Sequence, residues 1–286
     1  MYRCGARPPG LASRPGFGSA GREACPAWES GLFGVVPGLP AWQGSAGREA
    51  CPTGGFAAET LIRRRRLPHW DVPGATYFIT TCLAGSIPAK GLLDIANYRR
   101  ELEQRDQPAD ISQEEWHYRR EKMIFGRTDH WLDTEPAVRH LAAPNLAKIV
   151  VDSMFHFAEE RYTLLAFVVM PSHIHWVFRP LATWVESLGA DAEKRRPRER
   201  IMHGLKTYTA WNCNQLLKKQ GAFWQDESFD HCVRDDEELY RIIEYVELNP
   251  VKAGLVAVAS EWEYSSASIR LRHGIRYGDA LRKAHR

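Results

Sequence analysis

A strand–turn–strand pattern in the middle of the chain places the tightest limit on its fold. Residues 162–170 and 173–178 are two apolar runs, rich in β-branched and aromatic side chains, and only Pro171 and Ser172 separate them. A connection this short is typical of an antiparallel β-hairpin. We therefore expect the chain to contain an antiparallel sheet.

Segments with strand or helical periodicity continue on both sides of the hairpin. They are a strand at 75–82, an apolar helical pattern at 134–160 that Pro144 divides, a helix at 198–219 that ends at Gly221, a loose strand at 223–233, and a helix at 235–248 that stops at Asn249-Pro250. Residues 98–122 are highly charged with helical spacing, contain Pro108 and are expected to form a solvated insertion. The order β-α-β-β-α-β-α predicts an α+β fold, a ferredoxin-like split βαβ antiparallel sheet with flanking helices.

His173 and His175 lie two residues apart in the second strand of the hairpin. Residues at this spacing share one face of a strand, with about 6.5 Å between their Cα atoms. Two imidazoles that point the same way suit a divalent metal ion. Isolated His-x-His patterns are more often structural, so a metal site here requires further ligands.

Tyr245 and Asn249 lie four residues apart on the last predicted helix, which makes their side chains neighbours. In a functional interpretation, Tyr245 is a nucleophile and the amide carbonyl of Asn249 is a metal ligand. In a structural interpretation, Tyr245 packs at the edge of the core and Asn249 with Pro250 ends the helix. Tyr208 and Asn212 have the same spacing on the preceding helix, where packing accounts for Tyr208. Spacing alone leaves Tyr208 as an alternative nucleophile.

Six motifs in a fixed order make the chain similar to a known family. They are residues 67–70, 75–80, 168–175, 223–225, 229–234 and 245–255. Together they resemble the REP-associated tyrosine transposases, members of the HUH class of single-strand DNA endonucleases. The resemblance covers residues 61–270 and leaves residues 98–122 and 191–200 outside the shared core.

The resemblance implies roles for several of these residues. His173 and His175 would bind Mg²⁺ or Mn²⁺ in a ferredoxin-like core, and the attacking tyrosine would be Tyr245 rather than Tyr208. Related insertion-sequence transposases carry Gln where this chain has Asn249, which offers the same amide carbonyl on a shorter stem. The implied reaction is cleavage of single-stranded DNA through a 5′-phosphotyrosine, with rejoining at hairpins of repetitive extragenic palindromes.

The first 60 residues differ in composition from the rest of the chain. They hold 12 of the 22 glycines and seven of the 17 prolines, and the eight residues at 19–26 recur at 45–52. Such a segment cannot offset the entropy of ordering its backbone by burying apolar surface. We therefore expect a disordered low-complexity leader at 1–60, a transposase domain at 61–270 and a flexible basic tail at 271–286.

The charge balance restricts how this chain can contact DNA. With 38 Lys and Arg against 35 Asp and Glu, the net charge of +3 excludes a protein that coats DNA through overall charge. A local basic and aromatic cluster precedes the core: Arg63, Arg64, Arg65, Arg66, His69 and Trp70. It is interpreted either as an arm that contacts phosphates and stacks on bases or as a solvated run of charge. Residues 191–200 mix both signs of charge and are expected to form an exposed loop.

Two other functions remain open from the residues alone. One is a metal-dependent hydrolase in which the histidines act on a bound water and Tyr245 only packs. The other is a non-catalytic DNA-binding remnant of a mobile element. The chain shows no apolar run near the roughly 20 residues that span a bilayer and no paired cysteine spacing, so we expect a cytoplasmic protein. The expected partner is single-stranded or hairpin DNA, with no membrane and no small-molecule substrate, and a homodimer is an open alternative.

Overall fold

The computed structural model of this chain describes residues 61–64, 68–194 and 196–273, which all lie in one unit, Gln43–Arg286. The leader predicted at 1–60 lies outside these residues, as do Arg65, Arg66 and all of the predicted tail beyond residue 273. Among the described residues, no helix has the length and apolar composition that a membrane crossing requires.

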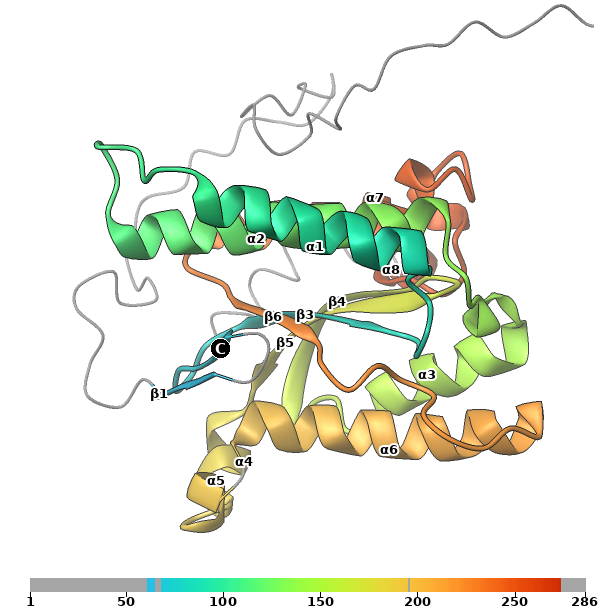
Figure 1. The fold of residues 1–286 in the computed structure, drawn as a ribbon. Helices are drawn as coiled ribbons and strands as arrows, with labels where there is room; N and C mark the ends of the chain where they lie inside the picture. The colour runs from blue at the N-terminus through green and yellow to red at the C-terminus, as the bar shows by residue number, and fades with distance from the viewer. Residues whose placement is uncertain (1–60, 65–67, 195, 274–286) are drawn as a thin grey trace, which may run out of the picture. The chain divides into compact units, whose positions relative to one another are not determined.

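Four strands form the central sheet: β3 Tyr77–Cys82, β4 Tyr162–Val169, β5 His173–Pro180 and β6 Phe229–Cys232. They lie in the order β4-β5-β3-β6, and every neighbouring pair is antiparallel. The first of these strands therefore lies between the third and the fourth, as in a ferredoxin-like sheet. This arrangement confirms the predicted hairpin and the α+β fold class. A separate two-stranded ribbon pairs β1 Leu61–Arg64 with β2 Pro68–Asp71 (Figure 1).

Helices cover both faces of the sheet (Figure 1). They are α1 Ala89–Gln104, α2 Gln113–Thr134, α3 Pro144–His156, α4 Ala182–Ser187, α5 Asp191–Lys194, α6 Pro197–Leu217, α7 Asp236–Lys252 and α8 Ser266–His273, with short 3₁₀ helices at His140–Ala142 and Ala259–Glu261. Buried residues of α3 and α6 pack against one face, and buried residues of α7 and α2 pack against the other.

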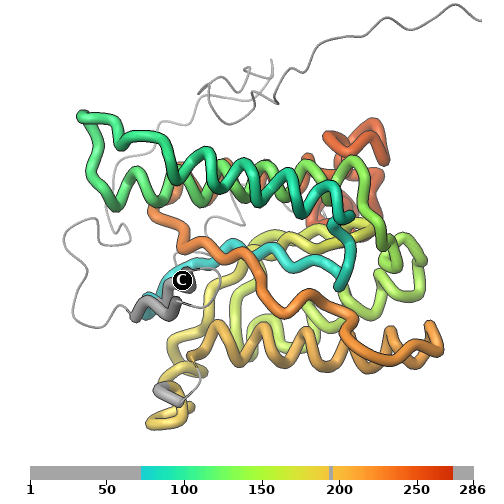
Figure 2. The backbone as a smooth tube through the Cα atoms, viewed as in Figure 1, coloured from blue at the N-terminus to red at the C-terminus, as the bar shows by residue number. Residues whose placement is uncertain are grey.

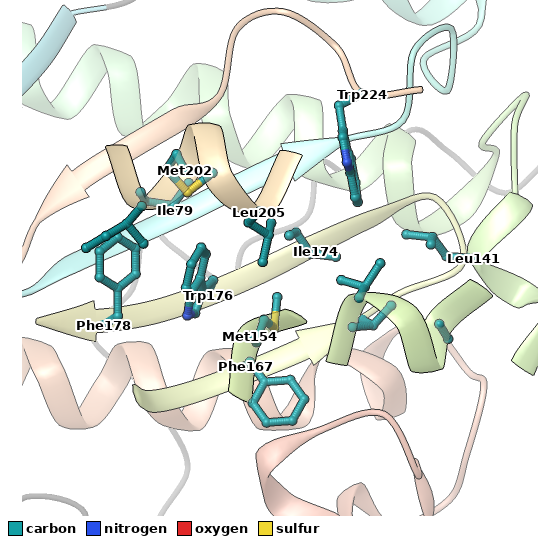
Figure 3. Close-up of a cluster of buried hydrophobic side chains, with 14 of the residues drawn as sticks. Ile79, Leu141, Met154, Phe167, Ile174, Trp176, Phe178, Met202, Leu205 and Trp224 are labelled. Atoms are coloured by element: carbon teal, nitrogen blue, oxygen red, sulfur yellow. The ribbon is translucent and has the colours of Figure 1, made fainter. Parts of the chain in front are cut away.

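The alternation of side chains along β5 divides the interior into two cores. Ile174, Trp176 and Phe178 point toward α3 and α6 and belong to the larger core, which Figure 3 shows. His173 and His175 alternate with them and therefore face α7, on the same side as Val177. Strand β5 is thus buried on both faces, with apolar side chains on one face and the two histidines on the other.

The segment predicted to be a solvated insertion with helical spacing belongs to a helical hairpin, α1 and α2, whose helices run side by side (Figure 2). Ser112 caps α2 because its Oγ accepts the N–H of Glu115 at 3.1 Å. Leu102 is the one buried residue of 98–122, and the other residues of this segment are exposed or half-buried. The predicted exposure of this charged segment is therefore confirmed.

Helix boundaries near prolines also differ from the prediction. Thr134 ends α2 instead of starting a helix, and Pro144 begins α3 instead of dividing one, because proline at the first turn has no N–H to satisfy. Helix α7 continues through Pro250 to Lys252, since the Ala253 N–H still reaches the Asn249 carbonyl at 2.9 Å.

The end of α6 and the start of β6 also differ from the prediction, for reasons of local structure. Helix α6 ends where Lys218 takes a left-handed conformation (φ 49°), three residues before Gly221. The loose strand predicted at 223–233 pairs regularly only at Phe229–Cys232, with Trp224 in an isolated bridge to Leu83.

Candidate active site

A pair of buried imidazoles lies at the centre of the candidate site. His173 and His175 are both 0% exposed, and their Nε2 atoms lie 3.1 Å apart. Burial lowers the pKa of His173 to about 3 and the pKa of His175 well below its ordinary value. Both rings are therefore neutral at neutral pH, which is the form that binds a metal ion.

Hydrogen bonds behind the imidazoles fix their orientation. The Nδ1 atom of His173 lies 2.9 Å from Ser172 Oγ, and that hydroxyl donates its proton to the Leu132 carbonyl at 3.0 Å. Ser172 must then accept from the Nδ1–H of His173, which leaves the Nε2 lone pair facing the site. The Nδ1 atom of His175 contacts Thr80 Oγ1 at 2.7 Å. Such partners are typical of imidazoles that coordinate metals.

Two carboxyl groups from α2 face the imidazole pair. Asp129 Oδ1 lies 3.4 Å from His175 Nε2 and 3.9 Å from His173 Nε2, and Asp133 Oδ1 lies 3.7 Å from His173 Nε2. Burial raises the pKa of Asp129 to about 7, and burial together with the charge of Asp129 raises the pKa of Asp133 to about 9. Neither of these Oδ1 atoms has a hydrogen-bond partner.

The sequence analysis did not identify Asp129 or Asp133. A signal was present, because Phe125, Asp129 and Asp133 follow each other at helical spacing and form a stripe that continues the buried face of α2. A carboxylate at a position where the pattern predicts an apolar residue is a candidate functional group. Both residues lie between 98–122 and 134–160, in a stretch for which no element was predicted.

Tyr245 reaches the same cluster from α7. Its hydroxyl donates a hydrogen bond to Asp129 Oδ2, and its side chain is only 5% exposed. Its ring packs edge to face against Phe78 at 6.0 Å and lies 5.4 Å from the His175 ring. Burial and the negative charges of Asp129 and Asp133 raise the pKa of the phenol well above its ordinary value.

Asn249 lies one helical turn after Tyr245 and is fully buried. Its Nδ2 atom is 3.2 Å from His175 Nε2, and its Oδ1 atom has no hydrogen-bond partner. A half-turn of the amide exchanges these two atoms, so the side chain can present its oxygen to the imidazole pair.

The donor atoms of this cluster suit a divalent cation. One ligand atom from each of Asp129, His173 and His175 lies within 4.8 Å of the others, and all three residues are buried. Burying carboxyl oxygens without hydrogen-bond partners is costly, and a cation would compensate these groups. The buried Asp/His/His group can therefore hold a metal ion.

The alternative tyrosine lies elsewhere. Tyr208 is 58% exposed on α6, on the face of the sheet opposite the histidines, so packing does not account for it and it does not reach the cluster. The basic segment begins in the ribbon, where Arg63 pairs with His69 and Ile62 with Trp70 in backbone register.

The expected exposed loop at 191–200 is also wrong. Residues Asp191–Lys194 form α5, and α6 starts at Pro197. Within α6, Arg198 is buried and pairs with Asp230 at 2.8 Å. An ion pair inside the protein removes this arginine from the surface charge that the sequence suggested.

Fold and site together define a class: an α+β protein with a buried His-His-Asp cluster, faced by a tyrosine, that can hold a metal ion.

The resemblance to REP-associated tyrosine transposases is confirmed by two curated relatives. A putative REP-associated tyrosine transposase of Haemophilus influenzae is 27% identical over 111 residues, which are 37% of this chain and 58% of that protein. A REP-associated tyrosine transposase of Escherichia coli is 29% identical over 105 residues, which are 37% of this chain and 54% of that protein. The chain thus spans little more than half the length of these relatives.

The chain was also compared with protein-family models and with solved structures. No protein-family model matches the chain. A solved structure described as a REP-associated tyrosine transposase bound to a REP hairpin aligns with a TM-score of 0.43 at 16% identity, over 76% of this chain and 88% of that chain.

Proposed function

We propose that this protein is a metal-dependent single-strand DNA endonuclease and transposase that uses Tyr245 as its nucleophile, within a domain at residues 61–270. The observation that supports it best is the convergence of the Tyr245 hydroxyl, two neutral imidazoles and a carboxylate in one buried cluster. These four groups come from three different elements: α7, β5 and α2. Packing alone does not require four polar groups to meet inside a core.

The metal ligands in this proposal are His173, His175, Asp129 and the amide oxygen of Asn249. Carboxylate and amide oxygens favour hard cations, so we propose Mg²⁺ or Mn²⁺. Such a cation, when bound, neutralises charge on the phosphate oxygens.

Tyr245 supplies the covalent chemistry. A phenol is a weak nucleophile while protonated, and Asp129 Oδ2 already accepts its hydrogen bond, so the proton has an acceptor in place. The phenolic oxygen bonds to phosphorus and the bond from phosphorus to the 3′ oxygen breaks. That oxygen takes up a proton to give a free 3′-hydroxyl, and the 5′ phosphate remains on Tyr245. Rejoining reverses these steps and needs no nucleotide cofactor.

The proposed substrate is single-stranded DNA next to a hairpin of the repetitive extragenic palindrome type. This choice is supported by the curated relatives, which are named REP-associated tyrosine transposases. Arg63, Arg64, Arg65 and Arg66, with His69 and Trp70, are proposed to contact the strand.

An adduct assay tests the proposal. The protein is incubated with labelled hairpin oligonucleotides and Mn²⁺, and a protein–DNA adduct that resists denaturant is expected. Tyr245→Phe should abolish the adduct, whereas the matched control Tyr208→Phe should keep it, because Tyr208 lies outside the cluster. Normal cleavage by Tyr245→Phe would instead support a hydrolase that uses a bound water. DNA binding without cleavage would support the non-catalytic remnant.

A further inference from the structure

The helical hairpin formed by α1 and α2, here called the cover (residues 89–134), closes the candidate site. Phe125 and Asp129 of α2 lie against the Phe78, His175 and Tyr245 side chains of the body. With the cover in this position, Tyr245 is 5% exposed and both histidines are 0% exposed. A phosphodiester that reacts at Tyr245 must touch its hydroxyl, and the closed arrangement leaves no such access.

Hydrogen bonds and close packing join the two helices of the cover, so we expect it to move as one unit. Arg127 contacts both carboxylate oxygens of Asp94 at 2.7 Å, and Trp131 Nε1 donates to the same carboxylate at 2.8 Å. At Gly91 the two helices are so close that an added Cβ would lie 2.9 Å from the Trp131 ring.

Polar contacts at one end attach the cover to the body. The Tyr118 hydroxyl donates to Glu238 at 3.0 Å, and Arg234 lies 3.4 Å from a carboxylate oxygen of Glu115. The Arg234 guanidinium also lies over the Tyr118 ring, 3.5 Å from its centroid. In this rim, the Arg234–Glu115 pair joins partly exposed groups and contributes little stability by itself, whereas Glu238, which accepts the Tyr118 hydrogen bond, is buried.

The underside of the cover combines the aromatic contacts of Phe125 with two carboxyl groups. Phe125 stacks on Phe229 with 4.0 Å between ring centroids. Asp129 and Asp133 face the imidazole pair beside it. When ionised, these two carboxylates repel a phosphate that approaches the closed site.

We propose that the α1–α2 cover holds this protein in a closed, self-inhibited state, with the Asp129–Tyr245 hydrogen bond as its latch. DNA reaches Tyr245 only after the cover lifts, and Asp129 returns to the metal site and to the Tyr245 proton when the cover settles on the bound strand. The statement that DNA must enter rests on the proposed function. The statement that the cover shields Tyr245 rests on burial and contacts alone, and the two are tested separately.

Chemical nitration of tyrosines by tetranitromethane, followed by peptide mass spectrometry, measures the shielding in EDTA. Two internal standards are available: Tyr208 is 58% exposed and Tyr162 is 2% exposed. In the wild type, Tyr245 should react as slowly as Tyr162. The rim variant Tyr118→Phe/Arg234→Gln and the latch variant Asp129→Ala should each speed nitration of Tyr245 by about tenfold, since each loses a hydrogen bond to a charged group.

The exposed Glu114→Gln on the same helix is the matched control and should leave the rate unchanged. Nitration of Tyr245 as fast as Tyr208 in the wild type would overturn the proposal, and so would rates that neither the rim nor the latch variant alters. The rim variant lies outside the cluster, so the test survives if Asp129→Ala fails to fold.

Hydrogen exchange and the adduct assay test the link to DNA. Hairpin oligonucleotide should speed amide exchange in α2, and the rim variant should form the adduct faster than the wild type. Slow nitration of Tyr245 with no adduct in any variant would refute the proposed function but not the shielding of Tyr245 by the cover. Equal adduct rates in wild type and rim variant, with no change in α2 exchange, would refute the proposal that the cover controls access of DNA.

Discussion

The hydroxyl of Tyr245 donates a hydrogen bond to the carboxylate of Asp129, a residue 116 positions earlier in the chain. The two side chains come from α7 and α2, which lie on the same side of the sheet as the imidazole pair. This relationship joins a segment that resembles a transposase motif to a helix that carries none of the six motifs. The Asp129 carboxylate therefore belongs to the cover and contacts both the proposed nucleophile, Tyr245, and the candidate metal centre.

Metal binding should stabilise the folded protein through the imidazole pair. At a free Mn²⁺ concentration 100-fold above the dissociation constant, linkage gives about 2.7 kcal/mol of stabilisation. His175→Ala should remove this gain, and Asp129→Asn should reduce it. The measurement is the shift of thermal unfolding between EDTA and Mn²⁺. The exposed His203→Ala is the control, and an equal loss in that variant would show that the histidine pair is not the site.

The stability of the protein without metal should fall as the pH rises above neutral. Asp133, with its pKa raised to about 9, keeps a proton in the folded state that the unfolded chain has already lost. Stability then falls with rising pH up to about pH 9, by at most about 1.4 kcal/mol per unit. Buried His173, with its pKa lowered to about 3, acts in the opposite direction, but only below about pH 6.5.

Urea unfolding in EDTA between pH 7 and 9 measures this slope. Asp133→Asn should flatten it, whereas the exposed Asp110→Asn should not. A flat profile for the wild type would contradict the burial of an unpaired carboxyl beside the histidines.

The apolar face of β5 should carry much of the stability of the sheet. Trp176 is 1% exposed in the larger core, and Trp176→Ala should cost about 3–5 kcal/mol because it leaves a cavity. Trp211 on α6 is 65% exposed, and Trp211→Ala should change stability by less than about 0.5 kcal/mol. Chemical denaturation measures the free energy of unfolding of both variants. Similar losses in the two would contradict the burial of Trp176 and the exposure of Trp211.

A buried ion pair fixes the helix that carries Tyr245. Arg270 Nε of α8 lies 2.8 Å from Glu247 Oε1 of α7, and Ser266 Oγ donates to the same oxygen at 2.5 Å. Arg270→Ala leaves that carboxylate without its cation and should cost about 3–5 kcal/mol. The exposed pair of Lys148 and Asp152 is the comparison, and Lys148→Ala should cost about 0–1 kcal/mol in the same unfolding assay.

Local periodicity was enough to predict the β-hairpin, the shared face of His173 and His175, and the α+β order of elements. These features depend on residues near each other in the chain, where the spacing of apolar side chains reports the backbone directly. The same local rules failed at Pro250. A proline there predicts a helix end, but the helix continues because later backbone groups still form their hydrogen bonds.

Only the tertiary structure shows that Tyr245, and not Tyr208, lies beside the histidines, and that Asp129 joins them. Both tyrosines have an asparagine one helical turn later, but α7 packs on the histidine face of the sheet and α6 packs on the other. Asp129 lies between the segments 98–122 and 134–160, in a stretch for which no element was predicted, and only the packing of α2 over the sheet brings it to the cluster. The physical reason is that spacing specifies which side chains share a face of one element, whereas the burial of apolar surface between elements determines which faces meet.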